Sequence, residues 1–236
     1  MQPWKSEVII GRRSSHLSEL GELQPRQFEY HPSLEGVMVL GTLKGEAVVI
    51  DSISKKVVRR FHAGLSESAS DALLGLCWFR RHPEYFIAGS SRGILRTCSI
   101  RPGEGALDRE SYSANLPDEF PKFKRLTSVH INCDDSMLLT SGYDNGVRLY
   151  DIQTGQIIRD MEDVHDDHIN ISRFANHTPH LFATSSFDCT IKMWDSRLAT
   201  HSIWNQRTDP SAGGGGGHHE EEVPLAGAGG EEGGAR

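Results

Sequence analysis

Short runs of alternating apolar and polar residues, separated by tight turns, dominate the chain from residue 26 onward. Four times, an apolar run ends in small residues, passes through a turn and continues into a second apolar run. The residue that precedes this second run is Gly45, Gly93, Gly146 or Thr190. Alternation with a period of two is typical of half-buried β-strands, and glycine accepts the backbone angles of tight turns. The pattern therefore predicts four β-hairpins.

Each hairpin is extended by a strand on either side. The strand before it is predicted at 26–32, 74–79, 126–131 and 169–174, and the strand after it is clearest at 57–61 and 156–161. The equivalent turn positions, 45, 93, 146 and 190, are separated by 48, 53 and 44 residues. That spacing suits a unit of four short strands and is too long for a hairpin alone. We therefore predict an all-β fold built from four repeated sheets.

The fourth copy carries the residues on which a family resemblance rests. It reads SSFDCTIKMWD from Ser185 to Asp195, and the third copy ends in Tyr150-Asp151 where the fourth ends in Trp194-Asp195. This pattern resembles the WD40 family of β-propellers, in which each copy forms one blade. The resemblance implies WD40 repeats over 26–204, with an N-terminal extension at 1–25 and a tail at 205–236. The approximate blades are 26–61, 72–115, 124–161 and 165–204.

In the WD40 family, a chain of hydrogen bonds often braces a blade. The resemblance assigns this chain to His168, Thr184, Asp188 and Trp194. A buried carboxylate must be hydrogen-bonded, and imidazole and indole N–H groups are suitable donors. On paper, the first three residues also fit a catalytic triad. Because they occupy the bracing positions of a scaffold blade, we predict a protein without catalytic activity.

The third copy matches the same pattern less completely. It offers Thr140, Asp144 and Tyr150, but Arg125 stands roughly where the histidine belongs. We therefore expect its hydrogen-bond chain to be incomplete.

Metal and cofactor sites find little support in the sequence. The histidines and aspartates of 163–168 lie in a loop between repeats, and His218-His219 lies in a glycine-rich tail, so neither has fixed ligand geometry. The four cysteines form no C-x-x-C pair. We predict neither a metal nor a cofactor. The cysteines are Cys77, Cys98, Cys133 and Cys189.

The ending Trp194-Asp195-Ser196-Arg197 resembles the DWD box, a segment that here runs from Phe182 to Arg197. In the family, such blades often dock on the damaged-DNA-binding adaptor of cullin-4 RING ubiquitin ligases, and the WD40 protein is the interchangeable substrate receptor. Asp195 and Arg197 lie two residues apart at a strand end and are expected to project to one side. There, the arginine fork can bind a partner's carboxylate or carbonyl.

The partners implied by this resemblance are the adaptor and a protein substrate of unknown identity. Together with residues 26–32, the single W-D-x-R ending further resembles plant DWD proteins linked to UV-B sensitivity. Two other interpretations stay open. In the first, Arg197 is a solvated surface residue. In the second, the chain is a general WD40 interaction platform in RNA processing, chromatin or trafficking.

Charge and composition narrow the function further. The formal net charge is −7, and the glycine-rich end from Ala212 to Arg236, with five glutamates and one arginine, carries about four of these negative charges. The remaining mild acidity argues against nucleic-acid binding, although short basic runs occur at 80–81 and 122–125. The chain has neither an apolar stretch of ~20 residues nor a secretory signal at its start. We expect a nuclear or cytoplasmic protein without a membrane partner.

Four copies are few for a closed ring, because WD40 rings usually have seven blades. Residues 205–236 are rich in glycine and glutamate and are predicted to be disordered. We therefore expect an incomplete ring. The interpretation we favour is a truncated or alternatively ended product of a longer propeller; closure by a partner's strands and a rare small ring are the alternatives.

Overall fold

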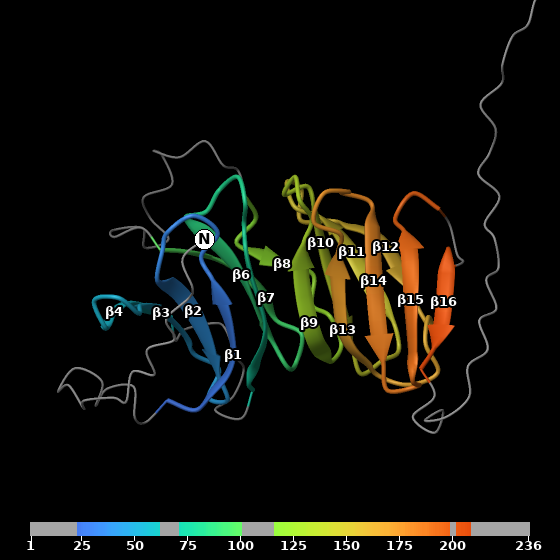
Figure 1. The fold of residues 1–236 in the computed structure, drawn as a ribbon, viewed down its shortest axis with the longest axis horizontal. Helices are drawn as coiled ribbons and strands as arrows, with labels where there is room; N and C mark the ends of the chain where they lie inside the picture. Colours follow the sequence, from blue (N-terminus) through green and yellow to red (C-terminus); the bar gives the residue numbers. More distant parts are fainter. Residues whose placement is uncertain (1–22, 62–70, 101–115, 199–201, 209–236) are drawn as a thin grey trace, which may run out of the picture.

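The computed structural model describes residues 23–61, 71–100, 116–198 and 202–208, and within these ranges every regular element is a β-strand (Figure 1). Sixteen strands form four antiparallel sheets, each of four strands in sequence order. They are named blades 1 to 4. Most of the predicted N-terminal extension (1–22) and of the predicted disordered tail (209–236) lies outside the described residues.

The strand bounds of the first two blades are as follows. Blade 1 comprises β1 (Pro25–Tyr30), β2 (Val37–Thr42), β3 (Ala47–Asp51) and β4 (Lys56–Phe61). Blade 2 comprises β5 (Leu73–Trp78), β6 (Tyr85–Ser90), β7 (Leu95–Ser99) and β8 (Glu119–Phe120).

The bounds of the last two blades follow the same plan. Blade 3 comprises β9 (Leu126–Ile131), β10 (Met137–Gly142), β11 (Val147–Asp151) and β12 (Ile157–Met161). Blade 4 comprises β13 (Ile169–Phe174), β14 (Leu181–Ser186), β15 (Thr190–Asp195) and β16 (Trp204–Arg207).

Two of the outer strands differ from the sequence-based boundaries. β8 lies at Glu119–Phe120, beyond the predicted end of the second blade at 115. β16 runs to Arg207, so residues 205–207, which were assigned to the tail, are the fourth strand of blade 4. A strand of two residues is too short to show alternation, and β16 is exposed along its whole length, so neither carries the apolar pattern of a buried strand.

The turns inside the hairpins use left-handed backbone conformations. Gly45 and Gly93 have φ angles of 77° and 87°, as expected for glycine in a tight turn. In blades 3 and 4, the left-handed residues are Asn145 (φ 59°) and Cys189 (φ 64°), one position before the aligned Gly146 and Thr190. Asparagine tolerates this region well, whereas a cysteine there is uncommon.

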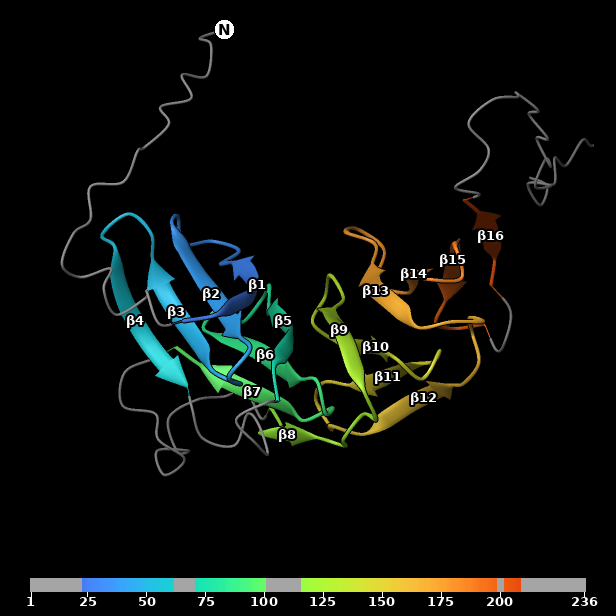
Figure 2. The ribbon, with the colours of Figure 1, turned by 90° about the horizontal axis from the view of Figure 1, so that it is seen from below.

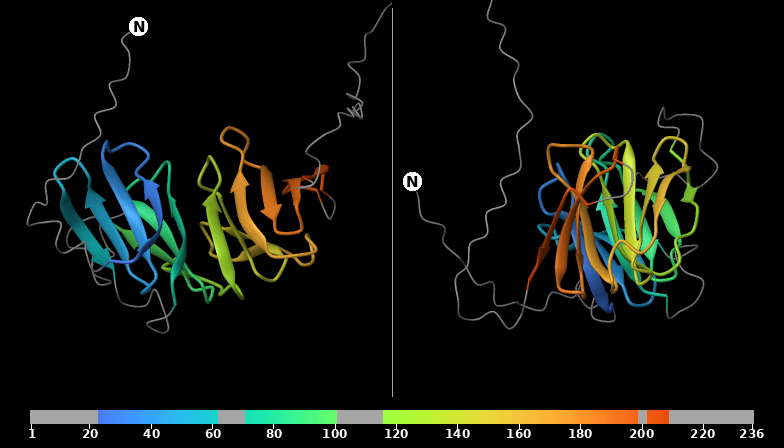
Figure 3. Two further views of the ribbon diagram at one scale, coloured as in Figure 1. Left: turned by 60° about the horizontal axis from the view of Figure 1, so that its bottom comes forward. Right: turned by 90° about the vertical axis from the view of Figure 1, so that its right-hand side faces the viewer.

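The blades stand side by side in an arc, and the first strand of each is innermost (Figures 2 and 3). β1 contacts β5, β5 contacts β9, and β9 contacts β13. The arc is open between blades 1 and 4 (Figure 2). Across its inner side, the guanidinium of Arg173 on β13 lies 3.1 Å from the carboxylate of Glu29 on β1. This ion pair links the first and last blades of the arc.

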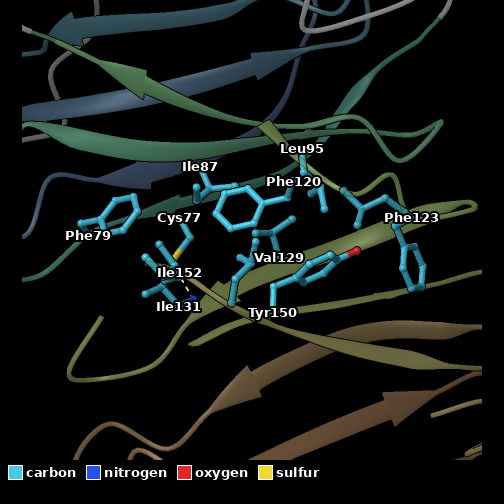
Figure 4. Packing of buried hydrophobic residues seen from close by; sticks show 12 residues of the cluster. Cys77, Phe79, Ile87, Leu95, Phe120, Phe123, Val129, Ile131, Tyr150 and Ile152 are labelled. Atoms are coloured by element: carbon cyan, nitrogen blue, oxygen red, sulfur yellow. Dashed lines mark hydrogen bonds between the residues drawn. The ribbon is translucent and has the colours of Figure 1, made fainter. Parts of the chain in front are cut away.

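The hydrophobic core is divided into three clusters, one between each pair of neighbouring blades. A blade of four strands cannot bury its own apolar faces, so each face is covered by the next sheet. Figure 4 shows the cluster between blades 2 and 3, in which Tyr150 and Phe120 pack edge to face with ring centroids 5.8 Å apart. The other two clusters contain Val39, Val49, Trp78 and Phe86, and Leu139, Leu149, Phe174, Phe182 and Trp194.

Candidate docking edge and the hydrogen-bond chain of blade 4

A buried chain of hydrogen bonds crosses blade 4. The indole N–H of Trp194 donates to Thr184 Oγ1 at 2.9 Å, and His165 Nε2 lies 2.7 Å from the same oxygen. His165 Nδ1 lies 2.8 Å from Asp188 Oδ2. Because Thr184 Oγ1 accepts a hydrogen bond from Trp194, its own hydroxyl can donate to His165 Nε2, which leaves the Nδ1–H to donate to Asp188. Each of the three contacts then contains one donated hydrogen, so donors and acceptors match along the four side chains.

The histidine in this chain is His165, not His168 as the sequence suggested. His168 lies at the surface, with 49% of its side chain exposed and its Nδ1 3.0 Å from Asp167. Its ring contacts the ring of Tyr143, with 5.1 Å between centroids. The choice between two histidines three residues apart depends on the path of the loop. The useful signal was Val164, an apolar residue that is buried just before His165.

The electrostatics of the chain favour a neutral imidazole beside a charged carboxylate. Burial lowers the pKa of His165, and its hydrogen bond to Asp188 offsets only part of this effect. Burial alone would raise the pKa of Asp188. Hydrogen bonds from the Thr190 hydroxyl, His165 and the backbone N–H groups of Asp166 and Thr190 outweigh that effect and hold this pKa well below its usual value.

This arrangement braces a blade and gives no access to a substrate. A nucleophilic hydroxyl must reach a reacting atom, but Thr184 is 1% exposed and its oxygen is already bonded to Trp194 and His165. The side chains come from the loop before β13, from β14, from the β14–β15 turn and from β15. The hydrogen bonds therefore connect the loop before β13 to the β14–β15 hairpin of the same blade.

Blade 3 has an aromatic ring where blade 4 has this histidine. Arg148 and Lys192 occupy equivalent positions, opposite Thr140 and Thr184 in their hairpins. Arg148 donates to the carbonyl of Lys122, and Lys192 to that of Val164, so the residues that follow are Phe123 and His165. Phe123 is buried at 4% exposure. A phenyl ring cannot donate a hydrogen bond to Asp144, the counterpart of Asp188.

The hydrogen-bonding state of blade 3 agrees with that difference. Among the described residues, the buried Asp144 Oδ2 has no hydrogen-bond partner. Arg125, which the sequence placed at the histidine position, instead stacks its guanidinium 4.5 Å from the centre of the Tyr143 ring. Arg125 is equivalent to His168, since their carbonyls accept the N–H groups of Tyr143 and Phe187 respectively.

The end of β15 presents an arginine that is held in place by its neighbour. Arg197 Nε donates to Asp195 Oδ1 at 2.9 Å and Nη2 to Oδ2 at 2.6 Å, and the Arg197 backbone N–H also reaches Oδ1 at 3.0 Å. The side-chain and backbone hydrogen bonds from Arg197 lower the pKa of Asp195 to about 2. The Asp195 side chain is 8% exposed and that of Arg197 is 64% exposed.

The three residues assigned to partner binding therefore differ in what they can contact. Trp194 is buried inside blade 4 at 4% exposure and belongs to the hydrogen-bond chain. Asp195 fixes the orientation of the guanidinium, and Arg197 exposes it. Beside it, Leu198 is 54% exposed, and its carbonyl accepts a hydrogen bond from Arg159 of blade 3. We name Asp195, Arg197 and Leu198 the docking edge.

The described residues contain neither a metal cluster nor a helical membrane span. No group of three or more histidine, cysteine or acidic side chains is placed to hold a metal ion within the described ranges. Within them, no helix has the length and apolar character that crossing a bilayer requires. His218-His219 lies outside the described residues.

Comparison with known proteins identifies the repeats. The family described as "WD domain, G-beta repeat" matches residues 120–151 and 161–195. The chain is 44% identical, over 174 residues, to "Protein DWD HYPERSENSITIVE TO UV-B 1" of Arabidopsis thaliana, which covers 74% of this chain and 22% of that protein. It is 22% identical, over 246 residues, to "Protein transport protein SEC31" of Ajellomyces capsulatus, covering 88% of this chain and 18% of that protein.

A third relative matches a shorter part of the chain. The chain is 28% identical, over 124 residues, to "Poly(A)+ RNA export protein" of Schizosaccharomyces pombe, covering 52% of this chain and 32% of that protein. The chain thus spans about a fifth to a third of the length of these relatives. The two segments matched by the family contain β9 to β11 and β13 to β15, the strands that show the repeat most clearly. The chain is a WD40-repeat protein.

Proposed function

We propose that this chain is a non-catalytic scaffold that acts as substrate receptor of a cullin-4 RING ubiquitin ligase. In this role, the docking edge of blade 4 binds the damaged-DNA-binding adaptor, and other surfaces of the arc bind the protein to be ubiquitinated. A place in the response to UV-B, in the nucleus or the cytoplasm, is part of the proposal. The similarity to a protein named for its DWD motif and its UV-B hypersensitivity supports it.

The observation that carries the proposal is the geometry of Arg197. Two hydrogen bonds from its own side chain to Asp195 fix the guanidinium, while 64% of the side chain stays open to a partner. An oriented arginine loses little entropy on binding and can still donate to a carboxylate or carbonyl of the adaptor. Exposed Leu198 adds apolar area beside it, and arginine is frequent among interface hot spots.

The proposal is tested by binding the full chain to purified adaptor. Arg197→Ala should weaken adaptor binding at least ~30-fold, which corresponds to a hot-spot loss of about 2 kcal/mol. Arg81→Ala, which removes an exposed arginine from the β5–β6 loop of blade 2, is the matched control and should bind like the parent. Unchanged affinity of the Arg197→Ala variant refutes docking through this edge.

The second candidate is an interaction platform in trafficking or RNA export, unrelated to ubiquitin. It is favoured by the matches to "Protein transport protein SEC31" and "Poly(A)+ RNA export protein". Both matches have lower identity than the match to the DWD protein. Co-purification of partners from plant cells separates the candidates, because the ubiquitin hypothesis requires ligase subunits among them.

A further inference from the structure

The three junctions between blades all join the same two kinds of face. Each blade has a forward face, which packs on the next blade, and a backward face, which packs on the preceding one. At the centre of the forward face, β2 and β3 pair Val39 with Val49, and β10 and β11 pair Leu139 with Leu149. All four of these residues are at most 1% exposed.

The backward face is built from larger side chains at equally regular positions. Its centre is a pair between the first and second strands, which is Trp78 with Phe86 in blade 2, Ile131 with Leu138 in blade 3, and Phe174 with Phe182 in blade 4. These four aromatic side chains are at most 5% exposed, because each is covered by the forward face of the blade before it.

The backward face of blade 1 keeps these residues but has no described sheet against it. Tyr30 pairs with Met38 at the position of the Trp78–Phe86 pair. Tyr30 is 59% exposed and Phe28 is 58% exposed, and their rings contact each other edge to face at 5.9 Å. Two adjacent aromatic side chains with this exposure indicate an association surface rather than a solvated one.

The forward face of blade 4 is uncovered in the same way. Ala183 pairs with Met193 at the position of Val39 and Val49. Ile191 is 38% exposed, whereas its counterpart in blade 3, Val147, is 1% exposed. Ile171 and Trp204, which are 38% and 42% exposed, extend this apolar surface toward β13 and β16. The chain therefore carries both halves of a blade junction.

We propose that the partner of these faces is a second copy of this chain. The forward face of blade 4 in one copy packs on the backward face of blade 1 in the other, and the reciprocal junction closes a ring of two copies. The contact continues the series of junctions already present inside the chain. Both faces border the opening of the arc (Figure 2). Eight blades in total lie within the ~4–8 blades that propellers use.

Side-chain size determines that the two copies join forward face to backward face. Inside the chain, small residues of the forward face admit the large residues of the next blade. A Cβ atom on Gly89 would lie 2.4 Å from Leu126 and 2.9 Å from Val129. Ser185 occupies the equivalent position in blade 4, as Ser141 does in blade 3, where the serine is fully buried in the junction with the next blade. Two backward faces would instead oppose aromatic rings without such space.

The test is the mass of the full chain in sedimentation equilibrium, across a range of concentrations. The parent is expected at twice the chain mass of 26.2 kDa. Tyr30→Asp and Ile191→Asp each place a carboxylate in one face and should weaken the dimer at least ~30-fold. Ile158→Asp is the control, because Ile158 is 50% exposed on β12, at a register irregularity outside both faces. It should leave the dimer unchanged.

Mixing the two variants distinguishes the arrangement from other dimers. An equimolar mixture of Tyr30→Asp and Ile191→Asp retains one native junction and should associate more tightly than either variant alone. That recovery also shows that both variants are folded. A parent of single-copy mass overturns the proposal. A dimer insensitive to Ile191→Asp, a mixture without recovery, or growth beyond two copies overturns it as well.

Discussion

The hydrogen-bond chain of blade 4 makes a sharp prediction about two neighbouring histidines. His165→Ala removes the acceptor of the Thr184 hydroxyl and one of the donors to Asp188, at distances of 2.7 and 2.8 Å. His168→Ala removes an exposed side chain that contacts Asp167 and Tyr143. We expect the first change to destabilise the protein strongly and the second to have little effect.

The magnitude follows from the groups that lose a partner. Leaving a buried donor or acceptor unsatisfied costs about 1–3 kcal/mol, with more for a charged group. Thr184 keeps the Trp194 N–H, and Asp188 keeps three donors from Thr190 and Asp166, so the loss is partial at both ends. With the cavity left by the imidazole, the expected loss for His165→Ala is about 3–4 kcal/mol. His168→Ala should cost less than about 0.5 kcal/mol.

Urea unfolding followed by tryptophan fluorescence and circular dichroism measures both values. Because Trp194 is a member of the hydrogen-bond chain, its fluorescence also reports on the surroundings of that chain. Asp188→Asn completes a double-mutant cycle with His165→Ala, and the two losses should be less than additive because the residues share one network. If His165→Ala costs less than about 1 kcal/mol, or His168→Ala costs as much as His165→Ala, His165 is wrongly assigned to the hydrogen-bond chain.

Two further predictions concern the junctions between blades. Burial, with smaller contributions from Arg173 and Arg80, lowers the pKa of His130 to about 4, and its Nδ1 accepts the N–H of Phe174 at 3.1 Å. Folding favours the neutral form of His130. The stabilisation that this group contributes is therefore present above pH 6.5 and is lost as the pH falls. Unfolding free energy should drop by about 2 kcal/mol from pH 7 to pH 5 through this group, and a His130→Gln variant should lack that part of the dependence in urea titrations. At Gly75, an added Cβ would lie 2.1 Å from a methyl group of Val129, so Gly75→Ala should cost about 1–3 kcal/mol. The Gly75→Ala/Val129→Ala double variant should then lose less unfolding free energy than the two single variants lose together. Losses that simply add would contradict the contact.

The strands that could be predicted from the sequence are those with local signals. The hairpins of blades 3 and 4 combine apolar alternation with turn residues that accept left-handed angles, and both cues act within a few residues. β8 has only two residues and lies about twenty positions after β7, while β16 is polar and exposed. Their positions depend on pairing with the third strand of the blade, which a local pattern does not encode.

The bracing residues show where local information ends. Thr184, Asp188 and Trp194 lie in one hairpin, so the fixed register of the hairpin brings them to one side. The histidine comes from the loop that crosses from blade 3, and its position depends on how that loop packs. Val164 is buried in the core between blades 3 and 4, and this contact turns His165 inward. Lys192 also donates to the Val164 carbonyl at 2.8 Å, so both the side chain and the backbone of Val164 hold the loop in place.

The W-D-x-R ending combines a structural role and a binding role in four consecutive residues. Trp194 points into the blade and donates to Thr184, whereas Asp195 orients Arg197 at the surface. A substitution of Trp194 therefore disrupts the strand that carries the docking edge, and loss of partner binding in such a variant cannot identify a contact. Arg197 is the residue whose replacement removes a contact while leaving the buried chain in place. Binding measurements on Arg197→Ala, with the stability of the variant checked in parallel, separate recognition from folding.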